Sequence, residues 1–444
     1  MKKQKPTLQE KLIKREYRPP NRFFNWIYHL VMGKIGLKKY HPEVIYRDDP
    51  RKEKGPCILL WNHLSRLDHA FVSRATYPMR YSMVAEYNEF FRSHLAFLFK
   101  IMHILPKKNF CVDYFGIKAI LSIVGQGGSP ALAPEGLASV TGYNERIISG
   151  LGKLVKRANL PVYFMEFHGQ GLAAPVYSPY NRSGGKTEVI VRKMFSTEQL
   201  KTLTPLQIEE TVQTAVSHDE YLWQKEHRYE WNTHGKGCEH LHEVCYQCPD
   251  CGTEFQMIGE GDVLRCRHCG LELTMNRYLE LIPNRTIDFL PESPSAWALW
   301  ERQHVIREIR ADPNYSFGGK MKIGNIPDYR LVRGKHRSTE IVGEGTFTAD
   351  HTGIHFDGVR NGIPCRFDLS YNDHYRLIQN INTACFALYV QGEYFEFFPE
   401  EPIVCKLDFV VQEMHRLHVN HWKPLPEHLY LYEGCELPGD GSSR

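Results

Sequence analysis

CILLWNHLSRLD, at residues 57–68, is the stretch that decides the fold of this chain. Its first half is an apolar run of the length of a buried strand, and a helix is expected to follow it near residues 65–76. The same alternation continues along the chain, with strand-like runs at 131–133, 161–167 and 188–193 and helix-like stretches at 90–102, 114–124, 150–158 and 204–230. Strands that alternate with helices predict an α/β sandwich.

The composition is that of a globular protein with several domains. The chain has 444 residues, of which 42% are hydrophobic and 24% charged. At about 100–200 residues per domain, this length suggests two to four domains and excludes disordered, collagen-like and fibrous proteins. The longest apolar stretch, near residues 90–105, is interrupted by Arg92, His94, Lys100 and His103, so no spanning helix is expected. The N-terminus lacks the apolar core of a secretory signal.

The net charge of +4 is unevenly distributed along the chain. Residues 1–60 carry 15 Lys and Arg against 6 Asp and Glu, residues 61–320 carry 28 of each, and residues 321–444 carry 12 against 17. A basic N-terminal end favours an anionic partner, either lipid head groups or nucleic acid. The alternative is a tail that only keeps the chain in solution.

Residues 21–37 have the pattern of an amphipathic helix that is too short to span a bilayer. Its apolar residues follow a helical spacing and leave two polar residues on another face: Phe23, Ile27, Leu30, Val31 and Ile35 against Asn25 and His29. Because basic residues precede it, such a helix can lie in a membrane interface. The alternative is a helix that packs its apolar side on the domain behind it.

His63 lies where the predicted strand gives way to a helix. Functional side chains gather at the carboxyl ends of strands in α/β sheets, and a histidine can accept and return a proton near neutral pH. Asp68 can fix its tautomer if His63 precedes the helix and Asp68 lies in the first turn. The alternative is that Ser65 and Asp68 form a capping box and His63 is an ordinary, partly buried histidine.

A second element, APEGLAS at Ala133–Ser139, also follows a short strand. Alone, its Pro-Glu-Gly sequence is a plain turn with a solvated carboxylate. In sequence order, however, a set of blocks resembles the glycerolipid (lysophosphatidate-type) acyltransferase family: Asn62-His63 with Asp68, the basic pair Lys107-Lys108, Pro134-Glu135-Gly136, and Leu151–Gly169 as a fourth block. The resemblance covers about residues 20–230.

The resemblance implies an α/β acyltransferase that moves an acyl chain from acyl-CoA or acyl-ACP to the hydroxyl of a lysophospholipid (1-acyl-glycerol-3-phosphate-like) acceptor in phospholipid biosynthesis. His63 would be the general base that takes the hydroxyl proton, and Asp68 would hold His63. Five residues would bind substrate: Asn62, Lys107, Lys108, Glu135 and Gly136.

The third block departs from the family pattern. Ala133, Leu137 and Ala138 stand where the family has Phe, Thr and Arg, and that Arg normally helps to bind the acceptor phosphate. Either Arg146 or Lys107 takes over this work, or the acceptor is not glycerol phosphate. Lys also replaces Arg in the basic block and binds phosphate as a point charge rather than a fork. The alternative to an enzyme is a non-catalytic lipid- or protein-binding scaffold that retains the fold.

Two CxxC pairs, each followed by Gly, form a separate motif at Cys248, Cys251, Cys266 and Cys269. Four thiolates at this spacing suit structural tetrahedral Zn²⁺ with no open position for chemistry, and a rubredoxin-type iron is the main alternative. Just upstream lie residues that form either a second site or a polar helix with ordinary thiols: Cys238, His240, His242 and Cys245.

A nucleic-acid-binding zinc protein is a third reading of the chain, and it rests only on this ribbon. The ribbon has few basic residues against its acidic ones and no aromatic residues interleaved with basic ones, so no nucleic-acid partner is expected. The other cysteines are expected to be reduced, because no secretory signal precedes them.

Short alternating strands and a closing amphipathic helix at residues 403–417 end the chain, in an order similar to pleckstrin-homology (PH) or GRAM-type domains. The predicted domains are therefore a basic tail with a membrane-facing helix, an acyltransferase domain, a zinc ribbon, a linker helix and a β-rich PH/GRAM-like domain, at residues 1–45, 46–235, 240–280, 290–312 and 315–425. The expected location is cytoplasmic, peripheral on the cytoplasmic face of a membrane, with its anionic surface as partner.

Overall fold

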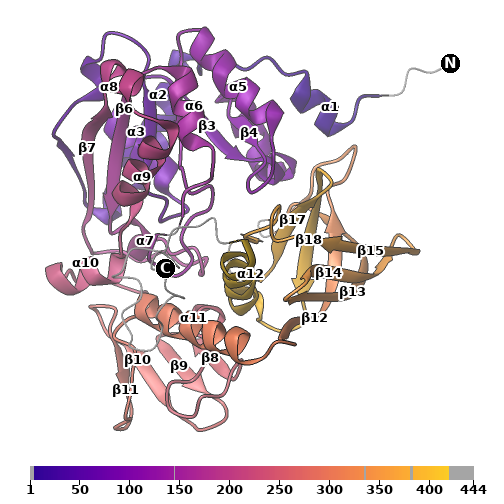
Figure 1. Cartoon of the computed structure of the whole chain (residues 1–444). Coiled ribbons are helices and arrows are strands. Elements are labelled where there is room, and N and C mark those ends of the chain that lie inside the picture. Colours follow the sequence, from indigo (N-terminus) through magenta and orange to yellow (C-terminus); the bar gives the residue numbers. More distant parts are fainter. Residues whose placement is uncertain (1–4, 145, 335–336, 381–383, 420–444) are drawn as a thin grey trace, which may run out of the picture. The chain divides into compact units, whose positions relative to one another are not determined.

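The computed structural model describes residues 5–144, 146–334, 337–380 and 384–419 (Figure 1). The end of the predicted 315–425 domain, at residues 420–425, lies outside this part of the chain. The chain divides into two compact units, Met1–Asn232 with Asn325–Glu340, and Thr233–Gly324 with Ile341–Arg444.

A seven-stranded mixed sheet forms the centre of the first unit, in the order β1-β7-β6-β2-β5-β3-β4. All neighbouring strands are parallel except the antiparallel pair β6 and β7. The strands are β1 (Pro42–Tyr46), β2 (Ile58–Trp61), β3 (Tyr81–Glu86), β4 (Leu105–Lys107), β5 (Ser129–Leu132), β6 (Val162–His168) and β7 (Thr187–Phe195). The expected α/β arrangement is thereby confirmed at this level.

Helices cover both faces of this sheet (Figure 1). On one face, α6 (Leu151–Ala158) and α9 (Pro205–Val216) pack on alternate residues of the central strands, among them Ile58, Leu60 and Phe164. On the other face, Phe71 of α3 (Asp68–Thr76) meets Phe167 with ring centroids 6.1 Å apart. The remaining helices of this unit are α1 (Leu8–Ile13), α2 (Arg22–Tyr28), the π-helix η1 (His29–Gly36), α4 (Ser93–Ile101), α5 (Tyr114–Gly125), α7 (Gln170–Ala173), α8 (Thr197–Thr202) and α10 (Glu220–His227), with short 3₁₀ turns η2 (Lys38–Tyr40), η3 (Pro50–Lys52) and η4 (Tyr87–Phe91).

The helix expected over residues 204–230 is two helices. Ser217 leaves the helical conformation at the end of α9, with ψ at 109°. Asp219 then caps α10, because its side chain accepts hydrogen bonds from the N–H groups of Tyr221 and Leu222.

The parallel register places several loops at one edge of the sheet. Strands β6, β2, β5, β3 and β4 all run the same way, so the residues that follow them meet at the same edge. The sequence blocks at Asn62-His63 and Glu135-Gly136 follow β2 and β5, and Lys107-Lys108 stands at the end of β4, with Lys107 its last residue. The fold therefore gathers blocks that are far apart in the sequence.

The second unit holds a zinc-ribbon sheet and a larger β sheet. The ribbon has the order β11-β10-β9-β8 and is antiparallel, with β8 (Met257–Glu260), β9 (Val263–Cys266), β10 (Glu272–Met275) and β11 (Leu281–Pro283), after a 3₁₀ turn η5 (Leu241–Glu243). Helix α11 (Pro294–Ala311) follows.

The larger sheet is a separate antiparallel one with a closing helix. Its order is β15-β14-β13-β12-β18-β17-β16, and the strands are β12 (Ser316–Asn325), β13 (Glu340–Asp350), β14 (Gly353–Arg360), β15 (Ile363–Leu369), β16 (Ile378–Gln379), β17 (Phe386–Val390) and β18 (Glu393–Pro399). Helix α12 (Val404–Val419) follows them. The PH- or GRAM-like type of this domain stays a prediction.

The segment Asn325–Glu340 clusters with the first unit rather than with the sheet that flanks it in sequence. Val332 exchanges two backbone hydrogen bonds with the chain on either side of Arg92, whose guanidinium also donates to Ser338 at 3.1 Å. This segment therefore adds a short strand-like contact beside α4.

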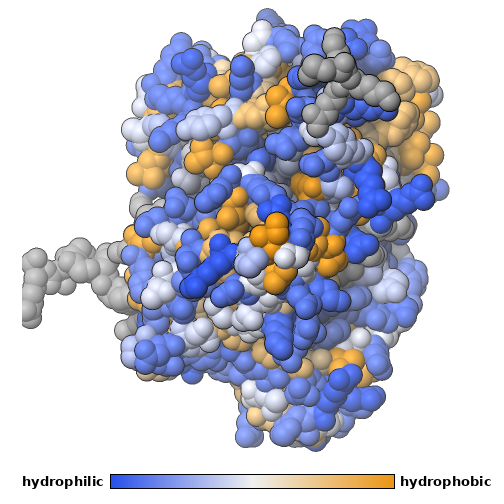
Figure 2. Space-filling model, turned by 90° about the vertical axis from the view of Figure 1, so that its right-hand side faces the viewer, coloured by the Kyte–Doolittle hydropathy of each residue, from blue (hydrophilic) through white to orange (hydrophobic). Residues whose placement is uncertain are grey.

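Within the described residues, no helix combines the length and hydropathy needed to cross a bilayer. On the face drawn in Figure 2, hydrophobic residues gather in several groups among hydrophilic ones. Large exposed apolar side chains are concentrated in two stretches of the first unit: Phe23, Trp26, Val31 and Ile35, and Phe97, Val112, Tyr114 and Ile117.

Candidate active site and metal centre

His63 and Asp68 form a direct pair at the carboxyl end of β2. The strand ends at Trp61 and α3 begins at Asp68, so the turn between them brings the two side chains together. His63 Nδ1 lies 2.7 Å from Asp68 Oδ2, and the same oxygen accepts the Leu64 N–H at 3.0 Å. The reciprocal capping box with Ser65 is absent, because the Ser65 hydroxyl accepts the Leu67 N–H at 3.1 Å and α3 has no side-chain cap. Besides His63, the Asp68 carboxylate is hydrogen-bonded by the backbone of Leu64 and Ser65.

The pair has one buried and one accessible member. Asp68 is 2% exposed, whereas the His63 side chain is 27% exposed. Burial raises the pKa of Asp68, and the hydrogen bond from His63 opposes that effect. An ionised Asp68 accepts the Nδ1 proton, which leaves a lone pair on Nε2 of neutral His63. This tautomer can take a proton from a hydroxyl group, as a general base does.

The side chain of Asn62 joins the ends of strands β2 and β6. Its side-chain amide donates to the Phe167 carbonyl at 3.0 Å and accepts from the Phe167 N–H at 2.7 Å. The residue is fully buried. Asn62 thus fixes the end of β2 against β6, and its predicted contact with substrate stays a prediction.

Glu135 supports the main chain of His63. It is 1% exposed, and its Oε1 accepts the His63 N–H at 2.7 Å. Asn144 donates to both carboxylate oxygens, at 2.9 and 2.8 Å, and the Ser139 N–H donates to the His63 carbonyl at 2.9 Å. The loop that carries the third block is therefore bonded to the backbone of the candidate base. This buried carboxylate positions His63, and direct acceptor binding by Glu135 stays a prediction.

The basic block lies beside Gly136. Asn109 Nδ2 donates to the Gly136 carbonyl at 2.7 Å, and Gly136 has φ of +72°, a conformation that favours glycine. Lys107 Nζ donates to the Lys108 carbonyl at 2.9 Å, and Lys108 Nζ lies 5.1 Å from the centre of the Tyr87 ring. The structure thus brings Lys107 and Lys108 to the sheet edge of His63, as the ordered blocks predict.

Asn144 and Asn109 are the residues of this site that the sequence patterns miss. Neither belongs to a block of the resemblance. Asn109 directly follows the basic pair, which is a usable signal, whereas Asn144 is found only through its contact with Glu135.

We expect Asn144→Leu to lower the free energy of unfolding by about 2–3 kcal/mol, because it removes the two amide hydrogen bonds to the buried Glu135 carboxylate. Asn25→Leu is the matched control, since buried Asn25 donates to the neutral Met79 carbonyl at 3.0 Å. That control is expected to cost about 1 kcal/mol. Urea denaturation measures both values, and equal losses would show that the Glu135 carboxylate does not need Asn144.

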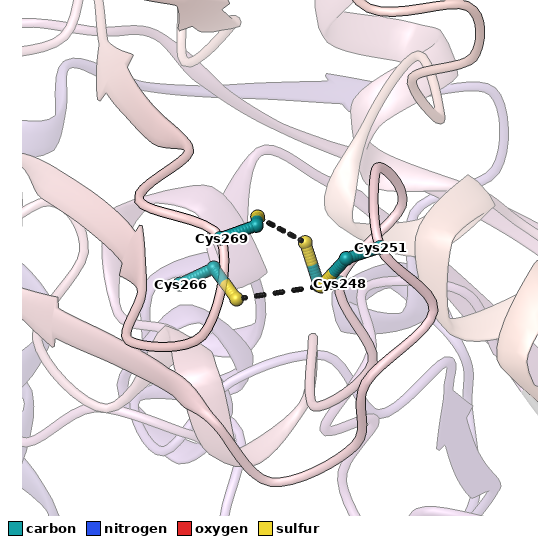
Figure 3. Close-up of side chains that lie close together, drawn as sticks. All are labelled: Cys248, Cys251, Cys266 and Cys269. Carbon is teal, nitrogen blue, oxygen red and sulfur yellow. Dashed lines mark hydrogen bonds between the residues drawn. The ribbon is translucent and has the colours of Figure 1, made fainter.

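The four cysteines of the ribbon converge on one point (Figure 3). Cys248 and Cys269 have sulfurs 3.7 Å apart, Cys251 and Cys266 have sulfurs 3.8 Å apart, and all four lie within 4.8 Å of one another. A tetrahedron with Zn–S bonds of about 2.3 Å has edges of about 3.8 Å. The donor set therefore fits structural Zn²⁺, held by four thiolates.

Each CxxC pair forms the same tight turn. Gly252 N–H donates to the Cys248 carbonyl at 2.9 Å, and Gly270 N–H donates to the Cys266 carbonyl at 3.0 Å. Both glycines have positive φ, of +72° and +74°, and an added Cβ would meet nothing within 4 Å. Backbone conformation rather than space therefore favours glycine here.

Helix α11 holds the residue before the first ligand. Gln247 N–H donates to Glu301 at 2.7 Å, the Trp297 indole donates to the Gln247 carbonyl at 3.0 Å, and His304 Nδ1 lies 2.5 Å from the Gln247 side chain. Because Gln247 precedes Cys248, the metal centre is joined directly to this helix.

The upstream histidines have protein partners of their own. His240 Nδ1 lies 2.8 Å from Glu243, and His242 Nδ1 accepts the Gly259 N–H at 3.1 Å. In the part of the chain that the structure describes, the four ribbon cysteines are the one group with metal-ligand spacing.

Residues 242–275 match a family model for a zinc ribbon, described as "DNA directed RNA polymerase, 7 kDa subunit". A search of curated proteins finds no match. Among solved structures, the chain is similar to the 1-acyl-sn-glycerophosphate (LPA) acyltransferase PlsC from Thermotoga maritima, with 11% identity and a TM-score of 0.36 over 43% of this chain and 76% of that chain. The family match supports a zinc ribbon at the four cysteines, whereas the likeness to PlsC is too distant to carry an argument about activity.

Proposed function

We propose that the chain is an O-acyltransferase that moves an acyl chain from an acyl thioester to a lysophospholipid hydroxyl. The observation that carries the proposal is the 2.7 Å contact of His63 Nδ1 with Asp68, which leaves Nε2 as the basic nitrogen of a partly exposed imidazole. His63 takes the hydroxyl proton while the oxygen attacks the thioester carbonyl. The C–S bond then breaks, and the protonated His63 returns the proton to the leaving thiolate.

The placement of the other blocks supports this proposal. Lys107 and Lys108 lie at the end of β4, at the same sheet edge as His63, where a cation can face an acceptor phosphate. The missing third-block Arg, at Ala138, leaves the identity of the acceptor to experiment. A non-catalytic scaffold is the competing proposal, and it does not require the hydrogen bond that Glu135 accepts from the His63 backbone.

A screen with labelled acyl donors tests the function. The purified chain is incubated with acyl-CoA or acyl-ACP and a panel of lysophospholipids that differ in head group, and labelled diacyl product is measured. Formation of product with one class of acceptor supports the proposal. Absence of product across the panel with both donors favours the scaffold.

We also propose that α2 and η1, together the interface helix (residues 22–36), dock on an anionic bilayer. The helix buries a polar and small stripe, Asn25, His29 and Gly33, against α3 and the loop after it. Four of its large apolar side chains are exposed, Phe23 by 58%, Trp26 by 45%, Val31 by 49% and Ile35 by 66%, whereas Phe24, Ile27 and Leu30 are half-buried. The alternative, that the helix packs its apolar side on the domain, is wrong for the four exposed residues.

The positive charges around the exposed apolar side chains favour an anionic lipid surface as the binding partner of the interface helix. Exposed basic residues flank the exposed apolar side chains: Arg22, Lys34, Lys38 and Lys39. Each such residue near an anionic surface contributes about 1 kcal/mol. We propose that the chain acts at the cytoplasmic face of a membrane, a reducing compartment that suits the thiolates of the ribbon. We expect no nucleic-acid partner.

Phe23→Ser with Ile35→Ser is expected to lower partitioning onto vesicles of phosphatidylcholine and phosphatidylglycerol by at least about ten-fold, since each buried side chain contributes about 1.5–3 kcal/mol. The matched control is Leu206→Ser with Leu222→Ser, which are 57% and 43% exposed on α9 and α10. Co-sedimentation at low and high salt measures binding. A double variant that binds as tightly as the parent would exclude docking through this helix.

A further inference from the structure

The interface helix contacts α3 immediately beside the candidate catalytic pair. Tyr28 Oη lies 2.6 Å from Nδ1 of His69, the residue that follows Asp68. Their rings are 6.0 Å apart between centroids. One hydrogen bond therefore separates the interface helix from the first turn of α3, whose Asp68 holds His63.

The contact continues along α3. His29 Nδ1 lies 3.1 Å from the Ser73 carbonyl oxygen, and the His29 ring stacks on Tyr77 with centroids 4.1 Å apart. At Gly33, an added Cβ would come within 3.0 Å of His29 Nδ1 and 3.4 Å of the Arg74 nitrogen. The interface helix is thus packed closely on α3 from Tyr28 to Gly33.

The link between Tyr28 and His69 is a hydrogen bond between neutral groups. Burial, and to a smaller extent the positive charge of a protonated His63, lower the pKa of His69 to about 4. Burial also raises the pKa of Tyr28 well above its ordinary value. The strength of the Tyr28–His69 hydrogen bond therefore depends on its geometry and not on the charge of either side chain near neutral pH.

The interface helix has two features that make its geometry responsive to a surface. Its second half, His29–Gly36, is a π-helix. This conformation is rare in proteins, and where it occurs it is often at a functional site. The interface helix is also short, and isolated helices of this length are marginal in water. A bilayer that buries the exposed apolar side removes both the solvent exposure and the freedom of the helix.

We propose that Tyr28 and His69 are positioning residues, through which docking of the interface helix on a bilayer holds Asp68 against His63 and raises turnover. This rests on the proposed acyltransferase function. Docking shifts α3 towards one arrangement only by the difference in free energy with which the bilayer binds the two arrangements. Coupling free energies between two sites typically correspond to a change of five-fold or more.

The test uses a water-soluble reaction, so that substrate delivery does not depend on the membrane. A hexanoyl form of the acceptor found in the screen, below its micelle concentration, and a hexanoyl form of the donor found there react with the full chain, with and without phosphatidylcholine–phosphatidylglycerol vesicles that contain no acceptor. For the parent, Tyr28→Phe and Tyr46→Phe, the rate per vesicle-bound enzyme is divided by the rate per enzyme without vesicles. Tyr46 is the matched control, because its hydroxyl donates to the Ala75 carbonyl at 2.6 Å, near the other end of α3.

Vesicles are expected to stimulate the parent and Tyr46→Phe by about five-fold or more, and Tyr28→Phe much less, although Tyr28→Phe binds vesicles as tightly. Hydrogen exchange is the second readout. Amides of residues 68–76 should gain protection on vesicles in the parent and not in Tyr28→Phe.

Equal stimulation of Tyr28→Phe and the parent overturns the proposal. So does unchanged exchange of residues 68–76 in a parent whose interface helix becomes protected. If that protection is present but no acceptor or donor supports turnover, the acyltransferase function fails and the mechanical link between the two helices stands.

Discussion

His63→Ala is expected to lower acyl transfer by about 10²–10⁴-fold, because it removes the group that takes the acceptor proton. The side chain is partly exposed and its main hydrogen bond is to Asp68, so the substitution removes little packing. Initial rates with the acceptor and donor found in the screen measure the effect, and a melting curve checks the fold. His227→Ala is the control for loss of an imidazole, because exposed His227 lies at the end of α10 with Nδ1 2.9 Å from the Trp223 carbonyl oxygen.

Asp68→Asn tests the second member of the same pair. The amide keeps the shape of the side chain but removes the charge that fixes the His63 tautomer and stabilises the imidazolium. Its expected loss of rate is nearly that of His63→Ala. Asp49→Asn, at a surface pair with Arg51, should leave the rate unchanged. Wild-type turnover in His63→Ala would show that the mechanism proposed here is wrong.

The sequence predicts the parts of the fold that depend on local pattern. The apolar run at residues 57–62, the helix at 114–124 and the CxxC turns all rest on short-range signals, and the structure has a strand, a helix and two glycine turns there. The gathering of His63 with Lys107 follows from parallel strands, which the alternation of elements indicates. The structure confirms the α/β type of the first unit for the same reason.

Tertiary contacts account for what the sequence does not reveal. The spacing of residues 21–37 identifies two faces of a helix but not which one is buried, and burial of Asn25, His29 and Gly33 depends on partners at residues 73–79. The role of Asn144 depends on a loop that folds back on Glu135. The spacing of Asp68 fits either a capping box or a contact with His63. The turn at residues 62–67 brings the carboxylate to His63.

The zinc centre carries the second large expected effect. Purified under reducing conditions without chelator, the chain should hold one Zn²⁺, and Cys248→Ser should lose it. Apparent binding free energies of structural Zn²⁺ are about 10–16 kcal/mol in zinc-finger peptides, which matches or exceeds the net stability of a whole domain. Loss of one thiolate is therefore expected to unfold the ribbon rather than loosen it.

Unfolding should spread from Cys248 into α11, because Gln247 is held by Trp297, Glu301 and His304. It should not reach β2 or α3, so acyl transfer per folded first unit is expected to persist. Elemental analysis and hydrogen exchange of residues 245–311 measure these effects. Cys365→Ser is the control, since this partly exposed cysteine of β15 is not a ligand. Iron in place of zinc would indicate a rubredoxin-type centre, and a full equivalent of zinc retained by Cys248→Ser would contradict the four-thiolate site.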